Sequence, residues 1–312
     1  MRLIFMGTPD FAVGVLDAIL DAGHEVAAVY TQPDKPKGRG KTMQYPPVKE
    51  KALSCQIPVH QPEKIRDPEV VRQMEDYRPD VIVVVAFGQI LPESILTLPP
   101  LGCINVHASL LPKYRGAAPI QRVIMEGETV SGVTTMYMAK GLDTGDMIEK
   151  IEVPIDPKET GGSYHDKLMA AGAELCVSTL DKIEKGTAKR IPQDDSLSSY
   201  AHMLTKAMGE LDFGQSADRL DRIIRGLNPS PSAYSHIDGK FLKIFEADVI
   251  ERSSSEEPGT VIAVDKKSFT VQCGSGALRI LVVQLEGKKK MPVSAFLLGY
   301  KITEGMRLNN PL

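Results

Sequence analysis

Short apolar runs alternate with stretches of helical periodicity over the first half of the chain. The runs at residues 3–6, 26–30 and 81–86 have the length of β-strands, and the last is apolar throughout, as expected of a strand buried on both faces. Apolar residues between Phe11 and Leu20 recur at helical spacing, and Gly23 follows where a left-handed helix C-cap would lie. This alternation predicts a Rossmann-like, doubly wound α/β domain with a mostly parallel sheet.

The same pattern continues to about residue 190. Segments 103–107 and 133–138 have the character of further strands of the sheet. Ser163 to Asp166 has the form of a capping box, and an apolar stripe runs from it toward Gly186. We therefore expect a long helix to begin at Ser163 and to close the first domain.

The pattern changes near Ile191, where the polar stretch 193–199 indicates a linker. After a short helix at 217–225, the chain consists of short apolar runs separated by turn residues such as Asp238-Gly239. Such spacing predicts a small OB-like β-barrel. We therefore expect three parts, namely a catalytic domain at 1–190, a linker at 191–206 and a β domain at 207–312.

Composition narrows the class of protein. The chain has 312 residues, a net charge of −3 and 42% hydrophobic residues, which excludes a disordered or wholly nucleic-acid-coating protein. Its four cysteines form no C-x-x-C pair, so neither a disulfide framework nor a cysteine zinc site is expected. No apolar run approaches the roughly 20 residues that span a bilayer, and no signal-peptide pattern opens the chain. We expect a cytoplasmic protein.

Candidate chemistry gathers at the end of one predicted strand. Asn105 and His107 are two residues apart, so their side chains point to the same face, at the edge where open parallel sheets bind ligands. An isolated N-x-H is more often structural. Here it runs into Leu110-Leu111-Pro112, and the segment Gly141 to Gly145 supplies a carboxylate, Asp143, between two glycines.

These residues suit acyl transfer to an amine. Attack on an acyl carbon creates an oxyanion that needs directed donors, and the attacking amine must shed a proton. Asn105 offers an amide donor and His107 an imidazole that Asp143 can hold. Ser109 lacks a G-x-S-x-G context and is expected to bond ligand or backbone. No second His or Cys stands at ligand spacing, so no metal is expected.

The motifs N-x-H-x-S-L-L-P at 105–112 and D-x-G-D at 143–146 follow Met6-Gly-Thr-Pro-Asp-Phe11 in the chain. With them the chain resembles the 10-formyltetrahydrofolate-dependent formyltransferases, and over nearly its full length those that act on methionyl-tRNA. The resemblance implies Asn105, His107 and Asp143 as catalytic residues and 10-formyltetrahydrofolate as formyl donor. It also implies a monomer that acts on initiator methionyl-tRNA, and a pterin pocket bordered by residues 87–91. The residues that it places at the folate site are Ser109, Leu110, Leu111 and Pro112.

A basic stretch follows the second predicted strand, with positive charges at Lys35, Lys37, Arg39 and Lys41. A generic charge run is a solvated loop, but here it lies beside the predicted site in a chain of negative net charge. The resemblance implies an insertion that reaches the tRNA acceptor stem, with Arg39 as the main contact. The run at Lys288 to Lys290 is equally expected to contact phosphate or to form a solvated turn. The arginines between 219 and 225 are weaker candidates for a tRNA contact.

Three other functions fit parts of the pattern. A glycinamide ribonucleotide or amino-sugar formyltransferase would use the same three residues, but neither explains the basic stretch together with a β domain. An RNA-binding module without catalysis would leave Asn105, His107 and Asp143 as a coincidence. Hydrolysis of the formyl donor is expected only as a slow side reaction. Tyr114 and Arg115 would contact the methionyl end of the substrate or pack the loop.

Overall fold

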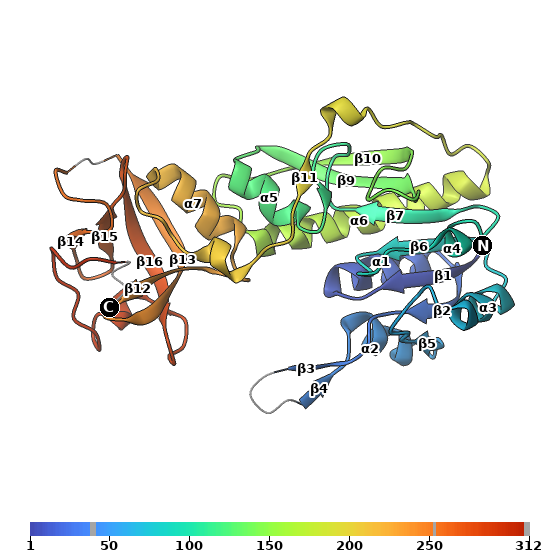
Figure 1. Cartoon of the computed structure of the whole chain (residues 1–312), viewed down its shortest axis with the longest axis horizontal. Helices are drawn as coiled ribbons and strands as arrows, with labels where there is room; N and C mark the ends of the chain where they lie inside the picture. The colour runs from blue at the N-terminus through green and yellow to red at the C-terminus, as the bar shows by residue number, and fades with distance from the viewer. Residues whose placement is uncertain (38–41, 252–253, 309–312) are drawn as a thin grey trace. The chain divides into compact units, whose positions relative to one another are not determined.

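The computed structural model describes residues 1–37, 42–251 and 254–308, and the chain divides into two compact units (Figure 1). The first unit comprises Met1–Pro119, Val130–Pro154 and His165–Ala201. The second comprises Ile120–Thr129, Ile155–Tyr164 and His202–Leu312. The boundaries predicted at 190 and 206 stay a prediction.

The described residues of the first unit form an α/β fold. Its strands are β1 (Arg2–Gly7), β2 (Glu25–Tyr30), β3 (Lys35–Lys37), β4 (Thr42–Gln44), β5 (Val59–His60), β6 (Val81–Val85), β7 (Cys103–His107), β8 (Arg115–Gly116), β9 (Val130–Tyr137), β10 (Met147–Pro154) and β11 (Tyr200–Ala201). The helices between residues 1 and 201 are α1 (Asp10–Asp21), α2 (Pro47–Ser54), α3 (Pro68–Asp76), α4 (Glu93–Leu96), α5 (Pro119–Glu126), α6 (Gly161–Glu184) and the 3-10 helix η1 (Asp195–Leu197).

The main sheet has the strand order β10-β9-β7-β6-β1-β2-β5 among the described residues. β1 pairs in parallel with both β2 and β6, β7 is parallel to β6, and β9 is antiparallel to β7. The chain leaves β1 toward β2 and β5 and returns to β6 on the other side of β1. This reversal is the topological switch point at which doubly wound sheets bind ligands. The predicted fold class of the first domain is confirmed.

Helices cover both faces of this sheet, and they fix the direction of the β7 side chains. One face packs Ile4 and Ile82 against α3 and α4. Cys103 lies on that face, because its thiol donates to the carbonyl oxygen of Ile95 in α4 at 3.4 Å. Val106 points the other way, toward Gly172 of α6. Successive strand residues alternate between faces, so Asn105 and His107 share the face of Cys103.

The start of α6 differs from the prediction. The Ser163 amide donates to Oγ1 of Thr160 at 3.1 Å, and the Thr160 amide donates to Oγ of Ser163 at 3.0 Å. Ser163 is therefore the closing residue of a capping box, not its first residue. The helix begins at Gly161, where a Cβ would lie 2.4 Å from the carbonyl oxygen of Gly226. Gly161 and Gly162 thus allow close packing in the first turn of α6. Because glycine is not typical of helices, the sequence pattern did not show where this helix begins.

The described residues of the second unit form an antiparallel sheet with short helices. Besides most of α5 and the start of α6, its elements are η2 (Lys206–Gly209), α7 (Ala217–Gly226), β12 (Ala233–Ile237), β13 (Lys240–Ile250), β14 (Val261–Val264), β15 (Phe269–Gln272), β16 (Ala277–Leu285), β17 (Met291–Pro292) and α8 (Val293–Phe296). Strand order is β12-β13-β16-β15-β14, and β17 pairs with β16. A separate antiparallel β domain is confirmed, while its OB-like closure stays a prediction.

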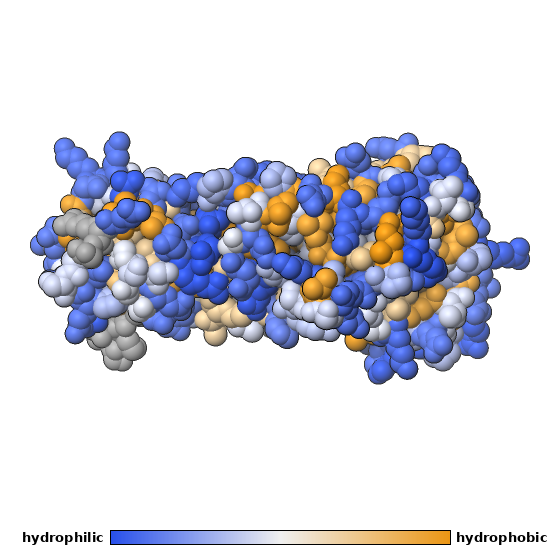
Figure 2. All heavy atoms as spheres, turned by 90° about the horizontal axis from the view of Figure 1, so that it is seen from above, coloured by the Kyte–Doolittle hydropathy of each residue, from blue (hydrophilic) through white to orange (hydrophobic). Residues whose placement is uncertain are grey.

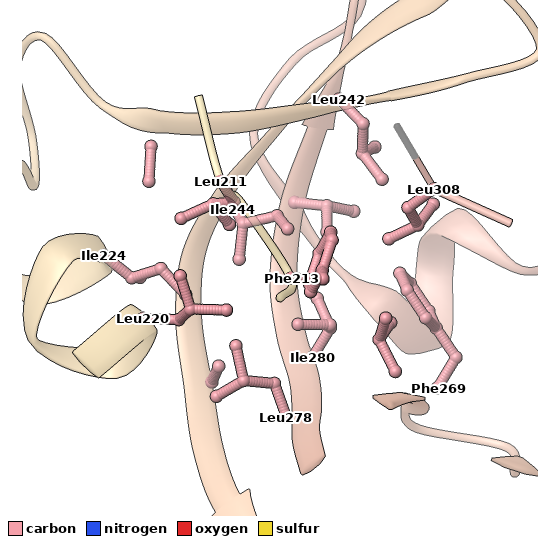
Figure 3. Packing of buried hydrophobic residues seen from close by; sticks show 14 of the residues in the cluster. Leu211, Phe213, Leu220, Ile224, Leu242, Ile244, Phe269, Leu278, Ile280 and Leu308 are labelled. Atoms are coloured by element: carbon pink, nitrogen blue, oxygen red, sulfur yellow. The ribbon is translucent and has the colours of Figure 1, made fainter. Parts of the chain in front are cut away.

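The core of the second unit lies between α7 and the sheet (Figure 3). Leu220 and Ile224 of α7 are fully buried and point toward Ile244 and Leu278. Ser216 caps the start of α7, because its hydroxyl accepts a hydrogen bond from the Arg219 amide at 3.3 Å. The apolar face of α7 and the apolar residues on one face of the sheet thus pack together in one layer.

Leu220→Ala is expected to lower the free energy of unfolding by about 2–5 kcal/mol, because it removes a fully buried side chain and leaves a cavity. Leu298→Ala is the matched control, since that leucine is 90% exposed and its truncation should change the free energy by less than about 0.5 kcal/mol. Urea unfolding of both variants measures the difference. Equal losses would contradict the packing in Figure 3.

All four cysteines are free thiols. Cys103, Cys176 and Cys273 are buried, and burial raises the pKa of each thiol to about 12. Cys55 is exposed.

Candidate active site

The end of β7 places two predicted catalytic residues on one face. Asn105 pairs with Val84 of β6 and Met136 of β9, and His107 pairs with Thr134 of β9. Only 9% of Asn105 and 6% of His107 is exposed. Both polar side chains are therefore largely desolvated and need partners in the protein.

Asp143 supplies those partners from the connection between β9 and β10. The Asn105 amide donates to Oδ1 of Asp143 at 3.4 Å, and Nδ1 of His107 lies 3.7 Å from Oδ2. The Gly116 amide donates to the same Oδ2 at 2.8 Å. The structure thus brings together Asn105, His107 and Asp143, which are up to 38 residues apart in the chain.

The His107 ring has a defined direction. Its Nε2 lies 2.9 Å from the carbonyl oxygen of Tyr114. A carbonyl only accepts hydrogen bonds, so Nε2 carries a proton and donates it to this bond. Nδ1 is then the ring nitrogen that can gain or lose a proton, and it faces the Asp143 carboxylate.

The segment after His107 is held by buried polar contacts. The Ser109 hydroxyl is fully buried and donates to the carbonyl oxygen of Lys113 at 2.7 Å. Oγ1 of Thr134 donates to the Ser109 carbonyl at 2.7 Å and accepts from the Leu111 amide at 3.1 Å. Of the two bonding roles expected for Ser109, the structure shows the bond to backbone. The Leu111 side chain is also buried, whereas Leu110 and Pro112 are half-buried.

The sequence predicts either a substrate contact or a packing role for Arg115, and the structure shows packing. Its side chain is 2% exposed and donates to Oε1 of Gln193 at 3.0 Å from Nε and 2.8 Å from one terminal nitrogen. Gln193 in turn donates to the carbonyl oxygens of Asp143 and Gly145. Sequence reasoning missed Gln193, because one glutamine in a polar stretch carries no periodic signal.

Two family profiles together match most of the chain. The profile described as "Formyl transferase" matches residues 1–180, and "Formyl transferase, C-terminal domain" matches residues 203–301. A methionyl-tRNA formyltransferase of Agathobacter rectalis is 56% identical over 305 residues, which cover 98% of each chain. The chain belongs to the methionyl-tRNA formyltransferase family. The family protein of Lachnospira eligens is 55% identical over 313 residues and 99% of each chain.

A solved structure confirms the fold at low identity. HypX of Aquifex aeolicus, solved with tetrahydrofolic acid, is 19% identical with a TM-score of 0.65. The match covers 98% of this chain and 50% of HypX, so the chain spans about half the length of that protein. At this identity the likeness concerns the fold alone.

Two segments near the catalytic residues expose apolar side chains. Ile90, in the predicted pterin-bordering segment, is 83% exposed, and Leu142, beside Asp143, is 56% exposed. The face in Figure 2 shows hydrophobic residues in patches among hydrophilic ones, as for most protein surfaces. Phe87 is buried and packs in the core of the sheet face that carries Asn105. Only part of segment 87–91 is therefore open to a ligand.

The basic stretch of this family member is a hairpin, not the predicted loop. β3 and β4 pair through Lys35–Gln44 and Lys37–Thr42, and Figure 1 shows them extending away from the main sheet. Lys35 is exposed. Arg39 and Lys41 lie outside the described residues, as does the side chain of Lys37.

Three basic residues of the second unit, Lys290, Arg219 and Arg225, have partners inside that unit. Nζ of Lys290 lies 4.4 Å from the centre of the Phe245 ring, a cation–π contact. Arg219 bonds the carbonyl oxygen of Met125. Nε of Arg225 donates to the Asp221 carboxylate at 2.7 Å. Arg219 and Arg225 therefore stabilise the unit.

Two further findings concern only the part of the chain that the structure describes. There, no helix has both the length and the apolar character needed to cross a membrane. Nor do three or more His, Cys, Asp or Glu side chains gather there as metal ligands would.

Proposed function

We propose that the chain transfers the formyl group of 10-formyltetrahydrofolate to the amino group of initiator methionyl-tRNA, giving N-formylmethionyl-tRNA. One observation carries the proposal. Asn105, His107 and Asp143 converge at the carboxyl end of β7 in a chain that is 56% identical over its length to a methionyl-tRNA formyltransferase. An amide donor, an imidazole and a carboxylate meet the needs of acyl transfer.

Each residue has a role in the proposed reaction. The amine attacks the formyl carbon, a new C–N bond forms, and the carbonyl oxygen becomes an oxyanion that the Asn105 amide stabilises by donation. His107 takes the proton that the amine sheds and gives it to the folate nitrogen as the bond from the formyl carbon to that nitrogen breaks. Asp143 orients His107 across the 3.7 Å separation and stabilises its cationic form. No covalent enzyme intermediate and no metal enter these steps.

The formyl donor is assigned to the segments beside these residues. Ser109, Leu110, Leu111 and Pro112 shape one segment, and residues 87–91 form the other. HypX, which shares the fold, was solved with tetrahydrofolic acid, which supports a folate donor. Because the Ser109 and Leu111 side chains are buried, we assign them to holding the segment, and its backbone with Leu110 and Pro112 to the donor contact.

The acceptor is assigned to the basic hairpin. Lys35, Lys37, Arg39 and Lys41 concentrate positive charge on a chain whose net charge is −3. The methionyl-tRNA formyltransferases at 55–56% identity support a tRNA acceptor. A monomer in the cytoplasm completes the proposal.

Arg39→Ala is expected to raise KM for methionyl-tRNA by about tenfold, because it removes one phosphate or base contact worth roughly 1–3 kcal/mol. KM for 10-formyltetrahydrofolate should stay unchanged. Steady-state kinetics at several salt concentrations measure both KM values. The dependence of KM for methionyl-tRNA on salt should weaken by about the contribution of one phosphate contact. Arg72→Ala, an exposed arginine on α3, is the matched control. Equal behaviour of the two variants would contradict the assignment of the hairpin.

A panel of acceptors tests the proposed function. Initial rates of formyl transfer from 10-formyltetrahydrofolate are compared for methionyl-tRNA, glycinamide ribonucleotide, an amino-sugar nucleotide and free methionine. The proposal predicts transfer to methionyl-tRNA, with slow hydrolysis of the donor as the other reaction. Transfer only to a small amine would keep the three catalytic residues and overturn the assignment of the acceptor.

A further inference from the structure

Gln193 bridges the catalytic loop and a buried arginine. Its Nε2 donates to the carbonyl oxygen of Asp143 at 2.7 Å and to that of Gly145 at 2.8 Å. Its Oε1 accepts two hydrogen bonds from Arg115, at 3.0 and 2.8 Å. One side chain from a stretch predicted to be a linker thus holds the backbone on both sides of Thr144.

Chemistry fixes the direction of the Gln193 amide. Guanidinium groups only donate and carbonyl oxygens only accept, so the oxygen must face Arg115 and the NH₂ group must face the loop. Both amide hydrogens and both acceptor positions are then used. Arg115 is held in turn by Asp195 at 2.7 Å and is 2% exposed. No other uncharged side chain of this length supplies both the acceptor and the two donors.

The loop needs such support, because its backbone conformation is uncommon. Asp143 has φ 52, in the left-handed region that non-glycine residues seldom adopt. This conformation persists only where the surroundings hold it. The loop approaches β9 closely as well, since a Cβ at Gly145 would lie 1.8 Å from the carbonyl oxygen of Tyr137. The direction of the Asp143 carboxylate therefore depends on contacts to its own backbone.

The segment around Gln193 is fastened to the same part of the protein. Ile191 and Met147 exchange two backbone hydrogen bonds, at 2.8 and 2.9 Å. The Arg115 amide donates to the carbonyl oxygen of Ser199 at 2.8 Å. Gln193 is therefore delivered to the loop by a segment that is paired on both sides of it.

We propose that Gln193, oriented by Arg115, is a positioning residue that holds the Asp143 carboxylate toward His107 and Asn105. This inference rests on the proposed function, since it assigns Gln193 to the same reaction. Gln193 touches no reacting atom in this role. It acts through Asp143 alone, and that restriction makes the inference testable.

Gln193→Met keeps the side-chain length and removes all four hydrogen bonds. We expect kcat for formyl transfer to fall about 10- to 100-fold, as for a displacement of about 1 Å at a catalytic group, with both KM values within twofold. Gln272→Met is the matched control, because Gln272 also donates to two backbone carbonyls, of Cys273 and Gly276, but in the second unit. Its kcat should stay within twofold of the parent. Thermal unfolding of both variants controls for loss of fold.

The double variant separates positioning from a general structural role. If Gln193 acts through Asp143, Gln193→Met should lower single-turnover formyl transfer little or not at all once Asp143→Asn is present. A further loss as large as in the parent would overturn the inference. So would a Gln193→Met enzyme with the kcat of the parent.

Gln193→Glu is a second variant for the case that Gln193→Met fails to fold. It keeps an acceptor for Arg115 but replaces the NH₂ donor that faces the loop, so it too should lose kcat, and parental kcat would overturn the inference. His107→Ala distinguishes failure of the site from failure of positioning. Parental activity in His107→Ala would overturn the proposed site and the inference with it, whereas an inactive His107→Ala beside a fully active Gln193 variant would overturn positioning alone.

Discussion

His107→Ala is expected to lower the rate of formyl transfer to methionyl-tRNA by about 10²–10⁴-fold, the usual contribution of a positioned acid–base group. The change removes the only ring nitrogen that faces Asp143, at 3.7 Å, and the donor that bonds the Tyr114 carbonyl. Both substrates should still bind, so kcat should carry the loss. Single-turnover kinetics at saturating substrates measure it.

The matched control for this variant is His202→Ala, since His202 is exposed and lies in the second unit. Its transfer rate should equal that of the parent. Thermal unfolding should show the His107 variant folded. A His107→Ala enzyme within tenfold of the parental rate would exclude His107 from the chemistry and leave Asn105 and Asp143 without their partner.

Gly145→Ala is expected to reduce activity by at least about 100-fold, because the new Cβ would lie 1.8 Å from the Tyr137 carbonyl oxygen. Neither atom is at the end of a flexible side chain, so the loop backbone must move. The carbonyl oxygen of Gly145 also accepts from Gln193 at 2.8 Å, and the movement would weaken that bond. Asp143, two residues away, would turn from His107. Steady-state kinetics and thermal unfolding measure the two effects.

Gly299→Ala is the control for the glycine substitution. A Cβ at Gly299 meets nothing within 4 Å, and its φ lies outside the positive range. This variant should have parental activity and a melting temperature within a few degrees of the parent. If Gly145→Ala behaved like Gly299→Ala, this would contradict the conclusion that the loop lies too close to β9 to accept a Cβ at Gly145.

The sequence predicted β7 to the residue and the main sheet in outline, because buried strands leave a continuous apolar signal. Asn105 and His107 could be placed on one face from their spacing alone. β10 was not predicted, because the run Met147–Pro154 mixes apolar residues with Glu149, Lys150 and Glu152 at the edge of the sheet. Whether such a segment forms a strand depends on its pairing with a neighbouring strand, and no local sequence pattern shows that pairing.

The supporting contacts of the site could not be predicted for a different reason. Gln193 meets Asp143 across 50 positions, and Arg115 meets Asp195 across 80. Polar side chains at such separations give no periodic signal, and only the fold brings them together. Only the structure could therefore decide between substrate contact and packing for Arg115. For Asn105 and His107, the surrounding motif already favoured a catalytic role over a structural one.

The most direct test of the proposed chemistry is a single turnover with labelled 10-formyltetrahydrofolate and methionine-charged initiator tRNA, run with the parent enzyme and with Asp143→Asn. The methionine released from the tRNA is then analysed for the N-formyl group. We predict labelled N-formylmethionine in near-stoichiometric amount from the parent and at least about 100-fold slower formation from Asp143→Asn. No labelled product from the parent, or equal rates from both enzymes, would contradict formyl transfer by Asn105, His107 and Asp143.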